Sequence, residues 1–348
     1  MQLISHLLSL WKDGSTALRK RAVIIVSSLI LANIAIWAGG ILFAQKNPLF
    51  LGLLTLAYGL GLRHAVDADH IAAIDNTTRK LMNDGQRPVG VGLFFSLGHS
   101  TIVIILSLLI AISTSFVKEN LPAFQAIGGV IGTSVSSIFL IVIGVINLLT
   151  FIELFRIFRK VTKGEMSHKE IGHDHVHLGG FLTKLFKPLL RTVHSSPQMY
   201  LVGLLFGLGF DTASEVGLLS ISAASSASGI PLWGIILLPL AFTAGMALID
   251  TLDGILMLGA YGWATIQPVR KLYYNLNITF ISVLVALFIG GVEAIQLLSR
   301  HLMLHGRVIR TIDQLNLQSF GYVTVIAFIL CWVVSLTLYK LKGYDKLK

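Results

Sequence analysis

The sequence predicts an all-α polytopic membrane protein, and three observations support this fold class. Hydrophobic residues make up 54% of the chain and charged residues only 13%, a balance typical of proteins that reside in a bilayer. Apolar runs of about 20 residues, the length that crosses the hydrocarbon core, recur along the sequence. Basic residues flank these runs, so the net charge of +10 indicates membrane topology rather than a nucleic-acid partner.

Eight runs are long and apolar enough to be transmembrane helices. They cover residues 22–44, 50–74, 91–116, 124–150, 199–224, 232–260, 274–298 and 320–340. An even number of spans places both termini on the same side of the membrane. The first run is too long for a signal-peptide core, so we expect it to be retained.

The distribution of Lys and Arg orients these spans. If the N-terminus is cytoplasmic, the inner segments carry 21 Lys and Arg residues and the outer loops carry five, with Arg63 left inside a helix. Cytoplasmic loops of membrane proteins carry such an excess. We therefore expect a multi-pass protein of the cytoplasmic (inner) membrane, in contact with lipid, with both termini in the cytoplasm.

One sizeable loop, residues 153–198, divides the chain. It lies on the predicted cytoplasmic side and separates an N-terminal half, residues 1–152, from a C-terminal half, residues 199–348, of a single transmembrane domain, residues 1–348. The loop contains a histidine tract with the core GHDHVH at residues 172–177. This tract either holds a metal ion transiently or is a solvated polar loop.

The second predicted span ends in an unusually polar run, RHAVDADHI at residues 63–71. Each ionisable side chain near the bilayer centre costs about 2.5–3.5 kcal/mol, so such a cluster indicates a function. On a continuous helix His64, Asp67 and His70 share a strip about 120° wide, whereas Asp69 points elsewhere. We interpret the three as metal-facing and Asp69 as a supporting contact; a buried ion-pair network that only joins helices is the alternative.

Three later spans contribute further polar side chains. His99, in FSLGHS, is the sole ionisable group of the third span. Asp211 and Glu215 in the fifth span are four residues apart, and Asp250 and Asp253 in the sixth are three apart, so each pair shares a helix face. Separately, these side chains also suit helix packing, hydrogen bonding between helices or a proton relay. Together with the second span they indicate a shared metal site.

Two other polar or sulfur-containing residues are not assigned to the site. Glu293 stands near the outer end of the seventh span, and we expect it to be interfacial. Met246 lies in the sixth-span motif, where a packing role is expected rather than an axial contact to a metal.

A weak internal repeat relates the two halves. GLGL at 59–62 recurs as GLGF at 207–210, and FSLGHS at 95–100 resembles FTAGMA at 242–247. The spacing from the first motif to the second is nearly the same in both halves. Because the second and fifth spans run in opposite directions, the repeat would be inverted and would relate helices 1–3 to helices 4–6, as in many secondary transporters. Chance similarity of glycine-rich apolar runs is the alternative.

The side chains available restrict the metal and the energy source. Mixed imidazole and carboxylate ligands suit nickel, cobalt or zinc, and the single cysteine, Cys331, cannot form a thiolate cluster. The sequence has no GxxxxGK[ST] phosphate-binding loop, so energy must come from gradients or from a partner. Since metal binding displaces protons from ligands, the carboxylate pairs are candidates for coupling metal movement to proton movement.

The motifs of the second, third, fifth and sixth spans resemble the four signature motifs of the nickel/cobalt transporter (NiCoT) family. They are RHAVDADHI, LGHS, GLGFDTASE and GMALIDTLDG, within residues 50–260. The first is the most specific, since His64, Asp69 and His70 reproduce the family's spacing. Ser214 stands where the family usually has Thr, and it retains the hydroxyl. The eight-helix plan extends the resemblance to the whole chain.

The resemblance implies a secondary transporter, not an enzyme, that imports nickel(II) or cobalt(II) with high affinity. The metal ion is its substrate, and no resident cofactor, nucleic-acid partner or obligatory ATPase subunit is expected. Carried over by position, the resemblance assigns the metal contacts to His64, Asp67, Asp69, His70, His99, Asp211, Glu215, Asp250 and Asp253.

Four alternatives stay open. An efflux protein of the same superfamily would also account for the histidine tract, and a membrane subunit of an ATP-driven importer would account for the spans. An intramembrane metalloenzyme is disfavoured, because the sequence contains no HExxH motif and no nucleophile beside a base. A metal sensor or scaffold would bind the ion without transporting it.

Overall fold

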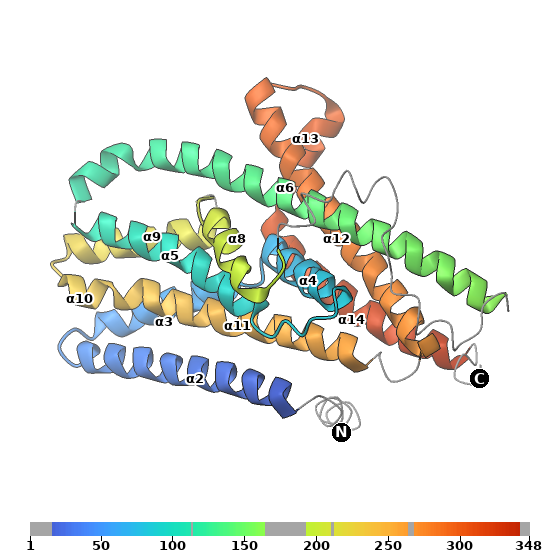
Figure 1. Ribbon diagram of the computed structural model, residues 1–348. Coiled ribbons are helices and arrows are strands. Elements are labelled where there is room, and N and C mark those ends of the chain that lie inside the picture. The colour runs from blue at the N-terminus through green and yellow to red at the C-terminus, as the bar shows by residue number, and fades with distance from the viewer. Residues whose placement is uncertain (1–15, 113, 164–192, 210–211, 264–267, 342–348) are drawn as a thin grey trace.

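The protein is helical throughout the part that is described. The computed structural model describes residues 16–112, 114–163, 193–209, 212–263 and 268–341, and all regular structure in these ranges is helix. Helices α2 (Thr16–Ala44), α5 (Val91–Ile112) and α11 (Leu237–Trp263) run roughly side by side along the long dimension of the molecule (Figure 1). The all-α class predicted from the sequence is therefore confirmed for these ranges.

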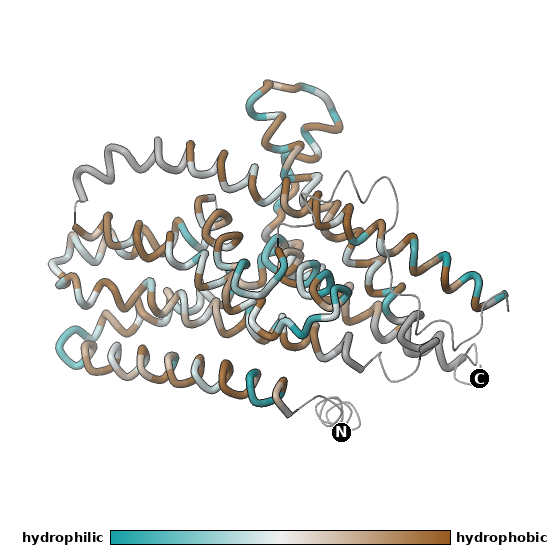
Figure 2. Tube along the Cα trace, viewed as in Figure 1, coloured by the Kyte–Doolittle hydropathy of each residue, from teal (hydrophilic) through white to brown (hydrophobic). Residues whose placement is uncertain are grey.

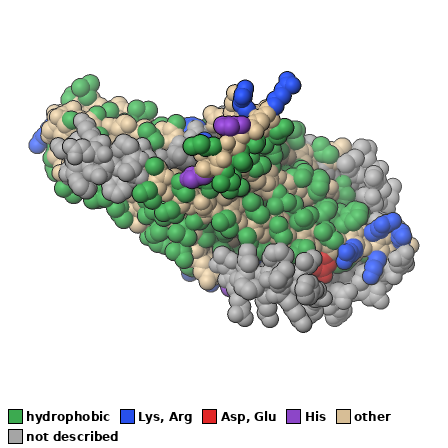
Figure 3. Space-filling view, turned by 90° about the horizontal axis from the view of Figure 1, so that it is seen from above, with side chains coloured by type: hydrophobic (Ala, Val, Ile, Leu, Met, Phe, Trp, Pro, Cys, Tyr) green, Lys and Arg blue, Asp and Glu red, His purple; other side chains and the backbone are tan. Residues whose placement is uncertain are grey.

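Several helices have the length and composition of membrane spans. Five of the described helices pass this test alone, and a bent pair, α3 (Leu49–His64) with α4 (Ala68–Asn83), makes a sixth if it is counted as one span. Hydrophobic residues extend along the long helices, whereas α4 is markedly more hydrophilic (Figure 2). Hydrophobic side chains also cover much of the surface seen in Figure 3. The chain is thus a multi-pass membrane protein.

Helix α6 (Thr114–Thr162) is much longer than the span predicted at 124–150. Its 49 residues extend about 74 Å at 1.5 Å per residue, well beyond the 30 Å of a hydrocarbon core. Residues 151–162, assigned from the sequence mostly to a loop, continue the helix, so the connection begins about ten residues later than predicted. Arg159 and Lys160 lie in its last turn, where cations interact favourably with the helix dipole.

Two predicted spans are broken near their polar motifs. The predicted span 50–74 is α3 followed by α4, which are bent by 52° at residues 65–67. The predicted span 199–224 is α8 (Met199–Phe206) followed by α9 (Ala213–Ala227). Asp67 and Thr212 are the N-caps of α4 and α9, both with extended backbone. Non-helical backbone at membrane depth is tolerated where it is buried in protein or lines a cavity.

The remaining elements complete the bundle. The 3-10 turn η2 (Ser196–Gln198) precedes α8, and α10 (Leu232–Ile235) precedes α11. Near the C-terminus, α12 (Pro268–Leu302) and α14 (Leu317–Leu341) pack together and are joined by α13 (Arg307–Asp313), which projects from the bundle (Figure 1). Helix α12 also packs along α6.

Glycines bring α3 and α11 into backbone contact. A Cβ on Gly61 would overlap the Phe242 carbonyl, and one on Gly245 would lie 2.9 Å from the Tyr58 oxygen. Only glycine permits this approach, which is how small residues join helices in membranes. The end of α3, where the polar motif begins, is therefore held against α11.

The same arrangement joins α5 and α8. A Cβ on Gly98 would overlap the Tyr200 carbonyl, and one on Gly203 would overlap the Phe95 carbonyl. As in the first pair, each helix contributes one glycine and one carbonyl from an aromatic residue. Because Gly98 precedes His99, the contact also fixes the position of that imidazole beside the α8–α9 break.

Candidate metal centre

Three histidines from three helices converge in the interior. His64 ends α3, His70 lies in the first turn of α4 and His99 lies in α5. Each offers one nitrogen, and these nitrogens all lie within 4.8 Å of one another. The residues are 1%, 0% and 3% exposed. Such a buried imidazole cluster is typical of a transition-metal site.

The break between α3 and α4 produces this convergence. Helix α3 stops at His64, a turn follows, and α4 restarts after Asp67 in a different direction. The two histidines therefore project into one space from separate helices. The sequence argument placed His64, Asp67 and His70 on one strip of a continuous helix, and that geometry was wrong because Asp67 is in the extended cap.

The two ring nitrogens of His64 have different neighbours: one contacts a carboxylate and the other faces His99. Its Nδ1 lies 3.0 Å from Asp67 Oδ2, and its Nε2 lies 2.9 Å from His99 Nε2. A carboxylate on the far nitrogen fixes the tautomer and the ring orientation of a metal-binding imidazole. Two nitrogens bound at right angles to one ion at about 2.05 Å would be about 2.9 Å apart. The His64–His99 spacing is compatible with two neighbouring coordination positions.

His70 has a similar carboxylate partner. Its Nδ1 lies 3.4 Å from Asp250 Oδ2 on α11, and Asp250 is fully buried. Among the described residues His70 Nε2 has no hydrogen-bond partner. A buried polar atom without a partner is costly, so this nitrogen fits a ligand that the protein alone does not supply.

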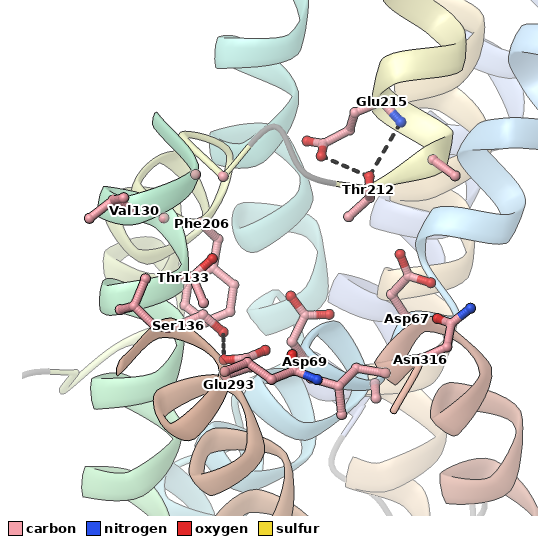
Figure 4. A pocket seen from close by; sticks show the side chains of 18 of the residues that line it. Asp67, Asp69, Val130, Thr133, Ser136, Phe206, Thr212, Glu215, Glu293 and Asn316 are labelled. Atoms are coloured by element: carbon pink, nitrogen blue, oxygen red, sulfur yellow. Dashed lines mark hydrogen bonds between the residues drawn. The ribbon is translucent and has the colours of Figure 1, made fainter. Parts of the chain in front are cut away.

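Glu215 supplies a carboxylate to the same cluster. Its Oε1 lies 3.0 Å from His99 Nε2 and 3.9 Å from His64 Nε2. Thr212 orients it, since the Thr212 hydroxyl donates to Oε2 at 2.8 Å and accepts from the Glu215 backbone N–H at 3.3 Å (Figure 4). Thr212 is thus an N-cap residue, whose side-chain oxygen accepts from a backbone N–H in the first turn, as at the start of many helices. It fixes the carboxylate at the start of α9.

The sequence-predicted residues thus divide into groups. His64, His70, His99 and Glu215 meet, and Asp67 and Asp250 contact two of the imidazoles. The other three do not join the cluster in the same way: Asp69 lines an adjoining cavity, Asp253 lies one turn after Asp250 within electrostatic range of Asp75, and Asp211 falls outside the described residues. The histidine tract of the loop also falls outside them.

Arg63 supports the centre from the end of α3. Its Nη1 donates to Ser214 Oγ at 2.5 Å, and its Nη2 lies 4.0 Å from Asp67 Oδ1. Ser214, the position where the family usually has Thr, therefore uses its hydroxyl to join α3 to α9. The guanidinium also offsets the negative charge of the Asp67 carboxylate.

Sequence reasoning missed two features near the centre. Glu293 was expected at the interface, but it is only 8% exposed and accepts a hydrogen bond from Ser136 Oγ at 2.8 Å. Farther along α4, Asp75 pairs with Arg79 at 3.5 Å inside the bundle. An acid alone in an apolar span could have indicated Glu293. The spacing of four residues could have indicated the helical ion pair.

A cavity of about 740 Å³ adjoins the cluster on the side of α6, α9 and α12. His64, His99 and Glu215 form part of its wall, and Figure 4 shows the side chains that line it. The candidate metal centre is therefore buried but lies beside a space large enough for water and ions.

Comparison with known proteins places this chain in a family. The model of high-affinity nickel-transport proteins, NicO, matches residues 50–338. A Cupriavidus necator protein named as a high-affinity nickel transport protein is 48% identical over 330 residues, 94% of each chain. NixA of Helicobacter pylori, named as a high-affinity nickel-transport protein, is 44% identical over 313 residues, 88% of this chain and 94% of its own.

A third relative is named as a cobalt transport protein. The cobalt transport protein NhlF of Rhodococcus rhodochrous is 38% identical over 336 residues, 93% of this chain and 94% of its own. No solved structure matches. The agreement of the family model with relatives over nearly the full length is decisive: this chain belongs to the NicO family of high-affinity nickel-transport proteins.

Proposed function

We propose that this protein carries nickel(II) across the cytoplasmic membrane, with cobalt(II) as a second substrate, and that it is a secondary importer. The observation that carries the proposal is the buried cluster of His64, His70 and His99, each from a different helix. Family membership and the nickel and cobalt names of the relatives support the choice of ion.

The donor set favours nickel or cobalt over other divalent ions. Three imidazoles and the Glu215 carboxylate form a mixed nitrogen and oxygen site, whereas magnesium and calcium prefer oxygen alone and copper(I) prefers sulfur. Met246 is fully buried in an apolar cluster with Phe242 and Leu238, which supports a packing role. We assign Asp67 and Asp250 the role of orienting His64 and His70.

The arrangement around the centre suits transport. The cavity lies on one side of the histidine cluster. Farther along α4, Arg79 fills the interior: it donates to Thr279 at 3.0 Å and to Ser282 at 2.6 Å, and it pairs with Asp75. A site that is open on one side and closed on the other is what alternating access requires. The excess of basic residues on the predicted inner side supports an outward-facing cavity and cytoplasmic termini.

We also infer eight spans and an inverted repeat of helices 1–3 and 4–6. The reciprocal packing of α3 on α11 and of α8 on α5 supports this repeat. It relates Tyr58–Gly61 to Tyr200–Gly203, and Phe95–Gly98 to Phe242–Gly245. The pairing of Phe95–Gly98 with Phe242–Gly245 is the same as in the sequence repeat. The pairing of Tyr58–Gly61 with Tyr200–Gly203 is shifted by six residues from the sequence match of GLGL with GLGF. The connection from α8 to α9 is longer than that from α3 to α4.

Uptake of radioactive nickel into proteoliposomes tests the proposal. The purified chain alone should transport nickel(II) down an imposed gradient, and cobalt(II) should compete. His64→Ala and His99→Ala should abolish uptake and weaken nickel binding in titration calorimetry, because each removes a nitrogen from the cluster. Met246→Leu is the matched control and should leave both unchanged.

The outcomes separate the alternatives. Binding without flux would indicate a sensor or scaffold, and flux that needs an added ATPase would indicate a subunit of a larger importer. Normal transport by correctly inserted His64→Ala would refute the site. Vesicles of known sidedness distinguish import from export, because uptake that requires the C-terminus to face the nickel would reverse the assigned direction.

A further inference from the structure

The wall of the cavity beside the metal centre is rich in carboxylates. Asp67, Asp69, Glu215 and Glu293 all line it, and the Arg300 guanidinium is the one Lys or Arg side chain among its described lining residues. Asp67 and Glu215 already contact the histidines. Asp69 and Glu293 remain to be explained, and each is costly to place at membrane depth.

Glu293 is held in place by a contact between helices. Ser136 on α6 donates to its Oε2 at 2.8 Å, and the residue is 8% exposed. Asp69 projects into the same cavity from the first turn of α4 (Figure 4). The two carboxylates therefore come from helices that are distant in sequence and meet one space.

The facing surface of α6 keeps this space open. Gly129, Thr133 and Ser136 line the cavity from this helix, and a Cβ on Gly129 would meet nothing within 4 Å. All three side chains are small or absent, and two carry hydroxyl groups. A wall of this kind leaves volume for water next to the carboxylates rather than filling it with apolar side chains.

The size of the cavity suits a hydrated ion. An ion with six waters, each with a liquid volume of about 30 Å³, occupies roughly 200 Å³, well within the 740 Å³ available. The histidine cluster is much tighter, since its donor nitrogens lie within 4.8 Å of one another. The two places therefore suit the same ion in two states, hydrated in the cavity and bound directly by protein at the histidines.

We propose that Glu293 and Asp69 form an outer capture site, where a hydrated divalent cation binds before it loses water and moves to the histidine cluster. Carboxylates attract the ion through its waters without displacing them, as hydrated divalent ions are commonly held in proteins. The Arg300 guanidinium is exposed, whereas Glu293 is buried, so solvent and salt screen the charge of Arg300 more than that of Glu293. This inference rests on the proposed transport function.

The kinetics of nickel uptake test the capture site. Glu293→Gln should raise the half-saturation concentration about ten- to a hundredfold, the range expected for one interaction with a charged group, and should leave the maximal rate near that of the wild type. The matched control is Asp313→Asn, which removes one negative charge from exposed α13, outside the cavity wall. It should change the half-saturation concentration less than twofold.

Manganese(II) provides a second readout that a structural defect would not mimic. Manganese prefers oxygen ligands, so it should inhibit nickel uptake by competing at the carboxylates. Glu293→Gln should weaken this inhibition at least tenfold, whereas Glu293→Asp, which keeps the charge, should retain most of it. Nickel titration of each variant should still show binding at the histidines, which excludes misfolding.

The results distinguish failure of this inference from failure of the transport function. If the wild type carries no nickel, the proposed function itself is wrong. If the wild type transports, and Glu293→Gln keeps the wild-type half-saturation concentration and manganese inhibition, there is no capture site at Glu293. A variant that does not fold is replaced by Ser136→Ala, which removes one hydrogen bond to the Glu293 carboxylate but keeps its charge, and this variant should give a smaller change in the same direction.

Discussion

The Asp75–Arg79 ion pair offers a sharp test of how the closed side of the bundle is stabilised. Asp75 is fully buried and Arg79 is 3% exposed. Arg79 Nη2 lies 3.5 Å from Asp75 Oδ1, and the Ser282 hydroxyl donates to Asp75 Oδ2. Asp75→Asn keeps a side chain that can accept from Ser282 but removes the charge that opposes the guanidinium.

The expected loss in the free energy of unfolding follows from the burial of the ion pair. Removal of one partner from a buried pair leaves an uncompensated charge and costs about 3–5 kcal/mol. We expect the lower end, about 3 kcal/mol, because Thr279 and Ser282 still accept from Arg79. That loss raises the ratio of unfolded to folded protein more than a hundredfold. Asp75→Asn/Arg79→Leu, which removes both charges, should be less destabilised than Asp75→Asn alone.

Reversible unfolding in mixed detergent micelles measures these free energies for the wild type, the two single variants and the double variant. A double-mutant cycle then gives the interaction between the two side chains. If the two single losses add to the double loss within about 0.5 kcal/mol, the pair contributes no coupling and the reasoning fails. It also fails if Asp75→Asn abolishes nickel uptake at unchanged stability, since the carboxylate would then act on the ion.

Two further predictions concern packing and capping. Gly98→Ala should destabilise the protein by at least about 1–3 kcal/mol, because the added Cβ meets the Tyr200 carbonyl, whereas Gly52→Ala, with nothing within 4 Å, should be neutral or stabilising in the same thermal unfolding assay. Equal effects of the two would contradict the close α5–α8 contact. Thr212→Ala should raise the half-saturation concentration for nickel uptake about tenfold or more, because Glu215 loses its orienting hydroxyl. Thr212→Ser, which keeps a hydroxyl, should behave as the wild type. Wild-type uptake kinetics for Thr212→Ala would refute this role.

Much of the helical plan is readable from the sequence because hydropathy is a local property. Each of the eight predicted apolar runs contains described helix. The breaks within two of them were not predicted, since an average over 20 residues does not detect a three-residue turn such as 65–67. The end of α6 at Thr162 was also missed, because its last turns are amphipathic rather than apolar.

The residues of the candidate centre were predictable as a set, but not as a geometry. Ionisable side chains in apolar runs stand out by their cost, and this pointed to His64, His70, His99 and Glu215. Which of the acids would lie against these histidines was not predictable. Asp250 contacts His70, whereas Asp253, three residues later, lies near Asp75, a difference set by the packing of α11 on α4.

The sequence by itself determined the fold class, the family resemblance and the set of ionisable residues that are energetically costly within the bilayer. Composition and motif spacing are properties of the linear sequence and do not depend on how the helices pack. Only the tertiary structure decided that His64 and His70 meet across a break, that His99 and Glu215 reach them, and that Glu293 lines the adjoining cavity. The physical reason is that these contacts depend on how closely helices approach. Backbone contacts at glycines such as Gly61 and Gly98 fix that approach, and their partners are distant in sequence.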